Sequence, residues 1–206
     1  MKGKYIVFEG PEHAGKGTQI NLTYDYLTSK NLQCVKTQEP GGTEVGKEIE
    51  RILKHRKDFD LHPLAEFFLF SSDRTQKFYE IVINSLKEGK IILSDRDFTS
   101  SLTYQGSGGK INIDFIKNTS EEATFGIKPN LTFILYQEDM EKALNEIDNP
   151  DRFEQKPLDY HQKVLEGYFQ IANEYPERYV LIPRKQRTPE QIHEEIRQHL
   201  KEKLGI

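Results

Sequence analysis

The first twenty residues carry the pattern that most restricts what this chain can fold into. An apolar run at residues 5–8 indicates a buried strand, and Gly10-x-x-x-x-Gly15-Lys16 and then a helical pattern follow it. Glycine permits backbone angles that a side chain forbids, so that consecutive backbone N–H groups can converge on one anion. The N-terminus of the next helix adds a partial positive charge. Strand, glycine loop and helix in this order therefore predict a phosphate-binding loop, in preference to a glycine turn without a ligand.

The end of this loop departs from the usual signature. Gly17 stands where Ser or Thr usually binds magnesium, and Thr18 comes one residue later. The string Gly-Lys-Gly-Thr-Gln at residues 15–19 resembles the loop of adenylate kinases. Lys16 is the side chain expected to reach the outer phosphates. Because Lys16 begins a helix, we expect it to be exposed when no nucleotide is bound.

The composition is that of a soluble globular protein with one domain over residues 1–206, a length ample for a core. Apolar residues make up 35% of the chain and charged residues 30%, which indicates a heavily charged surface. A net charge of −4 argues against nonspecific binding of nucleic acid. The single cysteine, Cys34, excludes a disulfide within the chain. Without a signal-peptide core or an apolar run of about 20 residues, we expect a cytoplasmic protein.

Short apolar runs alternate with helical patterns along the chain. The runs that indicate strands are residues 5–8, 33–38, 91–93, 131–136 and 179–182. Helices are predicted for about 14 residues after the loop and for residues 44–55, 63–87 with a bend near 71–72, 98–105, 111–125, 140–144 and 158–175. Residues 106–109 indicate a flexible break, and Thr188 caps a last helix. This alternation predicts an α/β fold: a five-stranded parallel sheet with helices on both faces.

Four further strings accompany the loop. They are Glu-Pro-Gly-Gly-Thr at residues 39–43, Leu-Phe-Ser-Ser-Asp-Arg-Thr-Gln at 69–76, Asp-Arg-Asp-Phe-Thr-Ser-Ser-Leu-Thr-Tyr-Gln-Gly at 95–106 and Asp-Arg-Phe-Glu at 151–154. In order and spacing the five strings resemble the thymidylate kinases, a family of P-loop nucleoside-monophosphate kinases. The resemblance extends from residue 5 to about residue 168. It implies transfer of the γ-phosphoryl group of ATP to dTMP, giving dTDP for dTTP synthesis.

Some of the site can be argued from the residues themselves. Asp95 ends an apolar strand, where a carboxylate can hold magnesium-bound water; the alternative is a helix cap for the next segment. Arg96 beside it has the forked shape that suits a phosphate. Phe70 and Arg74 lie four residues apart and share a helix face, so a ring and a guanidinium could stack on a base and donate to its carbonyl. Taken alone, the pair would better fit a core Phe and a surface Arg.

The resemblance implies the remaining roles, together with magnesium as the ion that accompanies ATP, a homodimer, a lid near residues 146–156 and a cis bond between Glu39 and Pro40. The residues implied for catalysis are Lys16, Arg96, Arg152 and Glu12. Those implied for ATP are Gly10, Pro11, Glu12, His13, Ala14, Gly15, Lys16, Gly17 and Thr18. Those implied for dTMP are Glu12, Phe70, Arg74, Arg96, Ser100, Ser101, Tyr104 and Gln105, with Tyr104 as the barrier against a ribose 2′-hydroxyl and Glu12 as the partner of the 3′-hydroxyl.

The chain departs from the family pattern where positive charge matters. Gln38 replaces an arginine beside the acceptor site, and Asp97 stands where an aromatic residue or histidine is usual. The loop position that carries a catalytic arginine in some relatives is His13 here, which leaves Arg152 as the lid cation. These departures keep two alternatives open: a kinase for another acceptor, such as dUMP or a deoxynucleoside, and a nucleotide-binding regulator with little turnover. A GTPase is disfavoured, because the chain has no Asn-Lys-x-Asp string.

Overall fold

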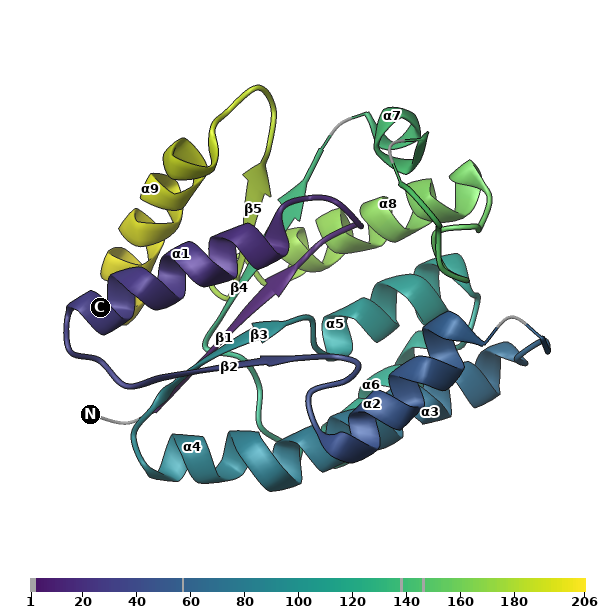
Figure 1. Ribbon diagram of the computed structural model, residues 1–206, viewed down its shortest axis with the longest axis horizontal. Helices are drawn as coiled ribbons and strands as arrows, with labels where there is room; N and C mark the ends of the chain where they lie inside the picture. The colour runs from purple at the N-terminus through teal and green to yellow at the C-terminus, as the bar shows by residue number, and fades with distance from the viewer. Residues whose placement is uncertain (1–2, 57, 138, 146) are drawn as a thin grey trace.

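The computed structural model describes residues 3–56, 58–137, 139–145 and 147–206. Five parallel strands form one sheet in the order β2-β3-β1-β4-β5. Their bounds are β1 Lys4–Glu9, β2 Cys34–Gln38, β3 Ile91–Asp95, β4 Leu131–Tyr136 and β5 Tyr179–Pro183. The predicted five-stranded parallel sheet is therefore confirmed (Figure 1).

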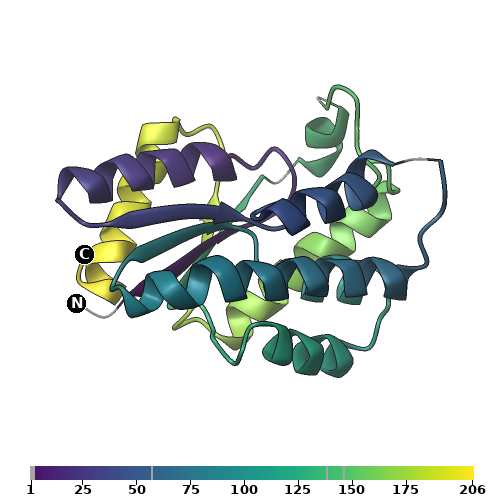
Figure 2. The same ribbon diagram turned by 60° about the horizontal axis from the view of Figure 1, so that its bottom comes forward.

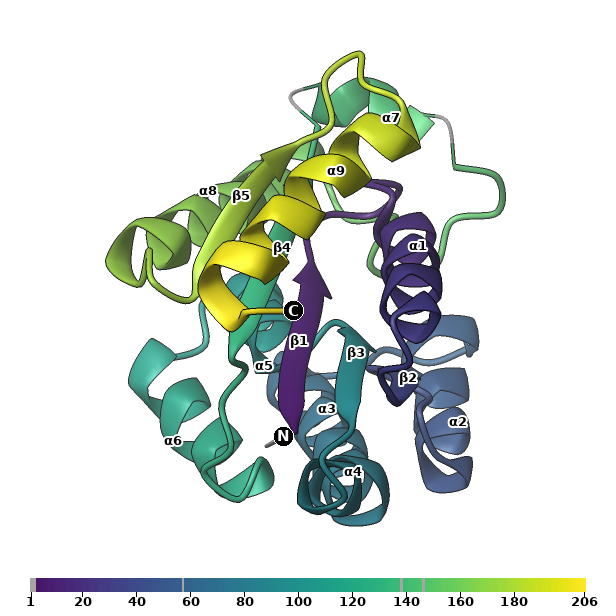
Figure 3. The ribbon, with the colours of Figure 1, turned by 90° about the vertical axis from the view of Figure 1, so that its left-hand side faces the viewer.

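Alternate side chains of each strand point to opposite faces, and each face has its own layer of helices. Ile6 and Phe8 of β1 belong to a core cluster with apolar side chains of α1 (Lys16–Ser29) and α9 (Pro189–His199). Helix α9 continues into a wide helical turn, η4 (Leu200–Leu204). Tyr5 and Val7 pack on the other face. Figure 3 shows α1 and α9 on one side of the sheet.

The opposite face is covered by the middle of the chain. The elements on this side are α3 (Pro63–Lys77), η2 (Phe78–Val82), α4 (Ile83–Lys87), α5 (Phe98–Ser101) and η3 (Leu102–Gly108), together with the later helix α8 (Leu158–Glu174). Helix α6 (Ile113–Ala123) packs outside them, on α3 and η3. Three further elements of the described residues complete the fold: α2 (Glu44–Glu50), η1 (Arg51–His55) and α7 (Met140–Asn145). No helix in the described ranges is long and apolar enough to cross a membrane.

The long helical stretch from 63 to 87 is irregular at a different place from the one predicted. The hydroxyls of Ser71 and Ser72 donate to the carbonyl oxygens of Phe67 and Phe68, both at 2.9 Å, within the regular helix α3. The backbone widens to π-helical geometry at η2 instead. Figure 2 shows α3, η2 and α4 as one continuous rod. The expected bend near residues 71–72 is wrong, because these hydroxyls bond within their own helix without breaking it.

The predicted flexible break at residues 106–109 is also wrong. The helix that starts at α5 continues as η3 through Gly108, beyond the predicted end at residue 105. A Cβ on Gly106 would lie 2.4 Å from Cδ1 of Ile113, and one on Gly108 would lie 2.5 Å from the ring of Tyr160. These glycines therefore mark close approaches of neighbouring elements. The next helix is two residues shorter at each end than predicted, since Asn112 caps α6 at its start.

Two local predictions are confirmed. Thr188 and Gln191 form the reciprocal hydrogen bonds of a capping box at the start of α9. The peptide bond between Glu39 and Pro40 is cis. Of the predicted lid at 146–156, residue 146 lies outside the described residues.

Candidate active site

The loop after β1 has the conformation that its glycines predict. Gly10 has φ 128°, and a Cβ there would lie 1.9 Å from the carbonyl oxygen of Leu135 on the neighbouring strand β4, so only glycine fits. Gly15 has φ 94° and nothing within 4 Å of an added Cβ, so its requirement is conformational. His13, at φ 57°, takes the left-handed conformation with a full side chain.

Lys16 differs from its prediction. Its side chain is buried, and its ammonium donates to the carbonyl oxygens of Gly10 at 3.1 Å and Pro11 at 2.9 Å. The expectation of an exposed lysine is therefore wrong, because the loop folds over its own first helical residue. Burial lowers the pKa of Lys16 from its ordinary value, and the neighbouring Arg96 adds to this effect.

Two pockets open at the carboxyl ends of the strands and share one wall. The loop pocket is lined by six residues of the phosphate loop and by residues at the carboxyl ends of β2, β3 and β5. The inner pocket extends from there between α3 and α5–η3. The shared wall consists of the residues that line both pockets: Glu12, Glu39, Pro40, Lys54 and Arg96.

The structure brings the predicted residues together in these two pockets. Glu12, His13, Gly15, Lys16, Gly17 and Thr18 line the loop pocket, while Gly10, Pro11 and Ala14 form the buried backbone behind it. All eight residues predicted for the acceptor line the inner pocket: Glu12, Phe70, Arg74, Arg96, Ser100, Ser101, Tyr104 and Gln105. Their individual roles stay predictions.

Arg96 lies at the centre of the shared wall. Its guanidinium pairs with the carboxylate of Glu12 and donates to the hydroxyls of Ser100 at 2.9 Å and Tyr104 at 3.2 Å. Burial by itself would raise the pKa of Glu12, but Arg96 and then Lys16 outweigh burial and lower this pKa to about 2. Glu12 is therefore a carboxylate at every physiological pH, and Arg96 is already aimed at the place where the two pockets meet.

Glu9, the last residue of β1, organises the turn that carries Arg96, and sequence reasoning did not single it out. Its fully buried carboxylate accepts hydrogen bonds from the backbone N–H of Asp97 at 2.9 Å and from that of Ser100 at 3.1 Å. The hydroxyls of Ser100 and Tyr168 donate to it as well, both at 2.7 Å. The available signal was an acid at the end of an otherwise apolar strand.

The sequence left two roles open for Asp95, the last residue of β3, and the structure gives one of them to Asp97 instead. The Asp97 carboxylate accepts from the backbone N–H of Thr99 at 2.7 Å and caps α5, which accounts for an aspartate at this position. The cap alternative for Asp95 is therefore wrong. Asp95 lines the loop pocket, and its Oδ1 is buried without a hydrogen-bond partner among the described residues. A carboxylate that lines the phosphate pocket and is not used as a helix cap fits a magnesium ion held through water.

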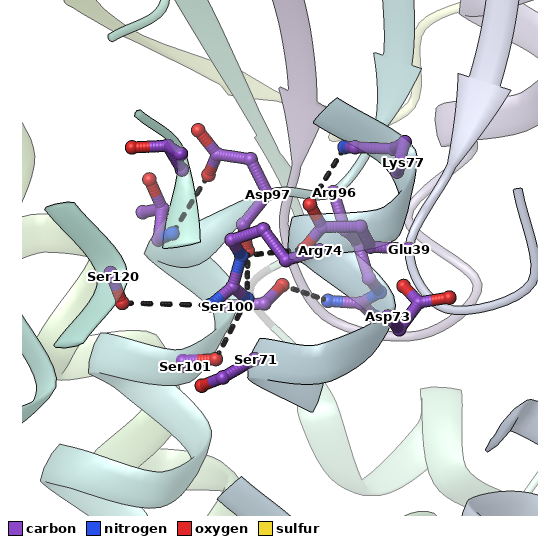
Figure 4. A network of polar contacts seen from close by, with 12 residues as sticks. Glu39, Ser71, Asp73, Arg74, Lys77, Arg96, Asp97, Ser100, Ser101 and Ser120 are labelled. Carbon is purple, nitrogen blue, oxygen red and sulfur yellow. Dashed lines mark hydrogen bonds and ion pairs between the residues drawn. The ribbon is translucent and has the colours of Figure 1, made fainter. Parts of the chain in front are cut away.

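Arg74 is buried, so the alternative of a surface arginine is wrong. Its side chain is 1% exposed, and its Nε donates to Glu39 at 2.9 Å, while the ammonium of Lys77 lies 2.7 Å from the other oxygen of that carboxylate (Figure 4). The rest of the guanidinium donates to Ser101 at 2.9 Å and, at 3.5 Å each, to Ser120 and the carbonyl oxygen of Asp97.

These four contacts, one from Nε, one from Nη1 and two from Nη2, use four of the five N–H groups of a guanidinium. Within the described part of the chain, one N–H of Nη1 has no hydrogen-bond partner, and Arg74 is among the residues that line the inner pocket. Phe70 lines the same pocket, with its ring 5.6 Å from that of Phe153.

Comparison with known proteins decides the family. The family model described as thymidylate kinase matches residues 8–196. This chain belongs to the thymidylate kinase family. A thymidylate kinase of Thermoanaerobacter sp. (strain X514) is 38% identical over 185 residues, 88% of this chain and 90% of that protein. One of Sulfurihydrogenibium sp. (strain YO3AOP1) is 40% identical over 181 residues, 87% of this chain and 88% of that protein. The crystal structure of thymidylate kinase from Ehrlichia chaffeensis has a TM-score of 0.81 at 29% identity and covers 97% of this chain and 100% of that one.

Arg152, the predicted lid arginine of this thymidylate kinase family member, does not face the site. Arg152 donates to the carbonyl oxygens of Arg56 and, at 3.0 Å, of Phe59, in the connection between η1 and α3. Among the residues that the structure describes, it lines neither pocket, although its neighbours Asp151 and Phe153 line the inner one. The structure therefore does not bring Arg152 to the shared wall.

Two cations that sequence reasoning missed do line the site of this family member. Arg184, just after β5, lines the loop pocket, and its Nη1 donates to the carbonyl oxygen of His13 at 2.9 Å. Lys54, in η1, lies on the shared wall. The only sequence signal for Arg184 was its position at the carboxyl end of a strand. Lys54 lies within a charged helix face and had no signal.

Proposed function

We propose that this chain transfers the γ-phosphoryl group of ATP to dTMP, giving dTDP. The observation that carries the proposal is the shared wall: a pocket lined by the phosphate loop and a pocket lined by all eight predicted acceptor residues meet at Glu12 and Arg96. In-line phosphoryl transfer requires two phosphate groups end to end with cations beside them, and it requires no covalent intermediate. Family membership supports the same reaction.

In this proposal the backbone of the loop and Lys16 hold the ATP phosphates, and Arg96 neutralises charge where the acceptor phosphate lies. Magnesium, when bound, supplies neutralisation of the nucleotide phosphates, and Asp95 is the residue that would hold it through water. The described residues contain no group of three or more His, Cys, Asp and Glu side chains that could hold a metal by themselves. This agrees with an ion that arrives with the nucleotide.

The base of the acceptor is expected at the far end of the inner pocket. Phe70 would stack on it, and the remaining N–H of Arg74 would donate to the carbonyl that thymine has and cytosine replaces with an amine. A donor that faces a donor leaves both groups unpaired, which costs about 1–3 kcal/mol. Tyr104, held by Arg96, would crowd a ribose 2′-hydroxyl.

Release of ADP from ATP and magnesium, measured with a panel of nucleoside monophosphates, tests the proposal. We expect the largest kcat/KM with dTMP, a lower value with dUMP, and values at least about tenfold lower with dCMP and UMP. Equal values for dTMP and dCMP would contradict the role of Arg74, and a good rate with UMP would contradict that of Tyr104. Absence of ADP release with every acceptor would favour the regulator over the kinase.

The homodimer, the lid at residues 146–156 and the cytoplasmic location belong to this proposal as family properties. Phe68 of α3 and Phe115 of α6 are exposed and have their ring centroids 6.2 Å apart, which gives a second copy an apolar surface to cover. Light scattering by the purified protein in solution should give twice the mass of one chain. A mass of one chain at all concentrations would exclude the dimer.

A further inference from the structure

The shared wall holds a second cation, Lys54, besides Arg96. Lys54 lies in the wide turn η1 that follows α2, and it lines both the loop pocket and the inner pocket. Its side chain is 30% exposed, and its ammonium pairs with Glu50, four residues earlier, at 3.2 Å. The positive charge of Lys54 helps to lower the pKa of Glu12, after the larger effects of burial, Arg96 and Lys16. Lys54 therefore lies close to the point where the two pockets meet.

The other two cations that line the inner pocket, Arg74 and Arg96, already have carboxylate partners. Arg74 and Lys77 share the buried carboxylate of Glu39. Arg96 pairs with Glu12, and it also lies 3.7 Å from Glu9. By contrast, the side chains of Lys54 and Glu50 are 30% and 22% exposed, against 1% and 3% for Arg74 and Glu39, and ion pairs four residues apart on a helix that water can reach are weak. Lys54 can therefore exchange its partner for an incoming anion at little cost.

The position of Glu50 also fits such an exchange. A Cβ built on Gly41 would lie 2.2 Å from Oε2 of Glu50, so this carboxylate packs directly on the turn that contains Pro40, itself a residue of the shared wall. Glu50 thus holds the Lys54 ammonium beside the inner pocket. The predicted loss of charge at Gln38, whose side chain donates to the carbonyl oxygen of Pro40 at 3.1 Å, occurs at the same turn.

We propose that Lys54 binds the phosphate group of the acceptor nucleotide at the shared wall and leaves Glu50 to do so. The inference rests on the proposed function, because a nucleotide with its base between Phe70 and Arg74 has its phosphate at the opposite end of the inner pocket. Lys54 and Arg96 then flank that phosphate from two different elements. The wall thereby regains a cation that Gln38 does not supply.

A purely structural role for Lys54 makes different predictions. If the lysine only stabilises its helix through Glu50, then removal of either partner should have the same effect. A phosphate-binding role instead gives the two partners opposite effects, since Glu50 competes with the phosphate for Lys54. It also restricts the effect of Lys54 to ligands that carry a phosphate.

The experiment is calorimetric titration of the full chain with dTMP and with thymidine, for wild type and for Lys54→Ala, Lys54→Arg, Glu50→Gln and Lys47→Ala. Lys47 is the matched control, a lysine of α2 paired with Glu44 and outside both pockets. We expect Lys54→Ala to weaken dTMP binding about tenfold or more, as for the loss of a charge-assisted hydrogen bond, and to change thymidine binding less than twofold. Lys54→Arg should recover most of the loss. Glu50→Gln should bind dTMP as tightly as wild type or more tightly, and Lys47→Ala should match wild type.

Equal weakening of dTMP and thymidine binding by Lys54→Ala would overturn the inference, and so would a Glu50→Gln variant as weak as Lys54→Ala. ADP release by wild type with dTMP separates this failure from that of the proposed function. An active wild type with an unaffected Lys54→Ala would refute the role of Lys54 alone. A wild type that binds dTMP no more tightly than thymidine and releases no ADP would refute both.

Discussion

Replacing Glu39 with glutamine tests how the acceptor pocket is held together. In the folded protein Arg74 and Lys77 are 1% and 0% exposed, and both point at the Glu39 carboxylate. Glu39→Gln keeps the shape of this side chain but leaves two buried cations without their shared counter-charge. Breaking a buried ion pair by removal of one partner costs about 3–5 kcal/mol. We therefore expect the free energy of unfolding to fall by about that amount.

The loss should be visible in both stability and selectivity. For a chain of this length, each kcal/mol shifts Tm by roughly 2–4 °C, so Glu39→Gln should melt at least about 6 °C below wild type. Because Glu39 also fixes the direction of Arg74, the preference for dTMP over dCMP should shrink. The matched control is Glu44→Gln, which removes an exposed carboxylate paired with Lys47 and should cost less than about 1 kcal/mol.

A double-mutant cycle with Lys77→Met makes the argument refutable. Glu39→Gln leaves two buried cations without a counter-charge, and Lys77→Met removes one of them. The free energy of unfolding of the double variant should therefore fall by at least about 1 kcal/mol less than the sum of the two single losses. Urea denaturation of the four proteins measures this coupling. A Glu39→Gln variant within about 1 kcal/mol of wild type, or strictly additive effects, would show that the buried cluster does not hold the pocket.

Three further perturbations follow from single contacts. Burial, reinforced by the charge of Glu39, raises the pKa of Asp73 to about 6, so the unfolded chain loses this proton at a lower pH than the folded chain and the free energy of unfolding falls between about pH 4 and pH 6. Asp73→Asn should therefore become more stable than wild type by up to about 3 kcal/mol as the pH rises from 4 to 7. A stability difference between the two proteins that does not change with pH in urea denaturation would contradict this. Asp97→Ala should lose about 1 kcal/mol with the cap of α5, whereas Asp97→Asn keeps the acceptor for Thr99 and should lose less; equal losses in the same assay would exclude the cap. Arg184→Ala should raise KM for ATP about two- to tenfold and leave KM for dTMP unchanged in steady-state kinetics, and the reverse pattern would place Arg184 on the acceptor side.

The parts of this protein that the sequence predicts correctly are those with a local cause. The loop, the five strands and the cap at Thr188 each follow from a few neighbouring residues, and all have the predicted form. The wide helical turns η1, η2, η3 and η4 have no such local signal, and two of the wrong predictions concern η2 and η3. Gly106 shows why: its small size is required by Ile113, a contact that only the packed structure reveals.

The site adds a second limit, which concerns acids at the ends of strands. Glu9, Glu39 and Asp95 each end or directly follow a strand, and in the sequence their positions look alike. Their hydrogen-bond and ionic partners separate them. The Glu9 carboxylate accepts hydrogen bonds from the turn that leads into α5, and the Glu39 carboxylate pairs with two cations of α3. Such carboxylates can shape a pocket but have little capacity left for a ligand.

Asp95 is the exception, since one of its oxygens is buried and has no partner among the described residues. Asp95 also lines the loop pocket, where a carboxylate that forms no ion pair within the described residues can hold magnesium-bound water. The cations differ in the same way: Arg74 and Lys77 share the fully buried carboxylate of Glu39, whereas Lys54 has one partly exposed partner, Glu50. Arg96 and Arg74 are fixed in place by their partners before any substrate binds, whereas Lys54 and Asp95 keep capacity for a new partner, and both properties arise from contacts between elements that are distant in the sequence.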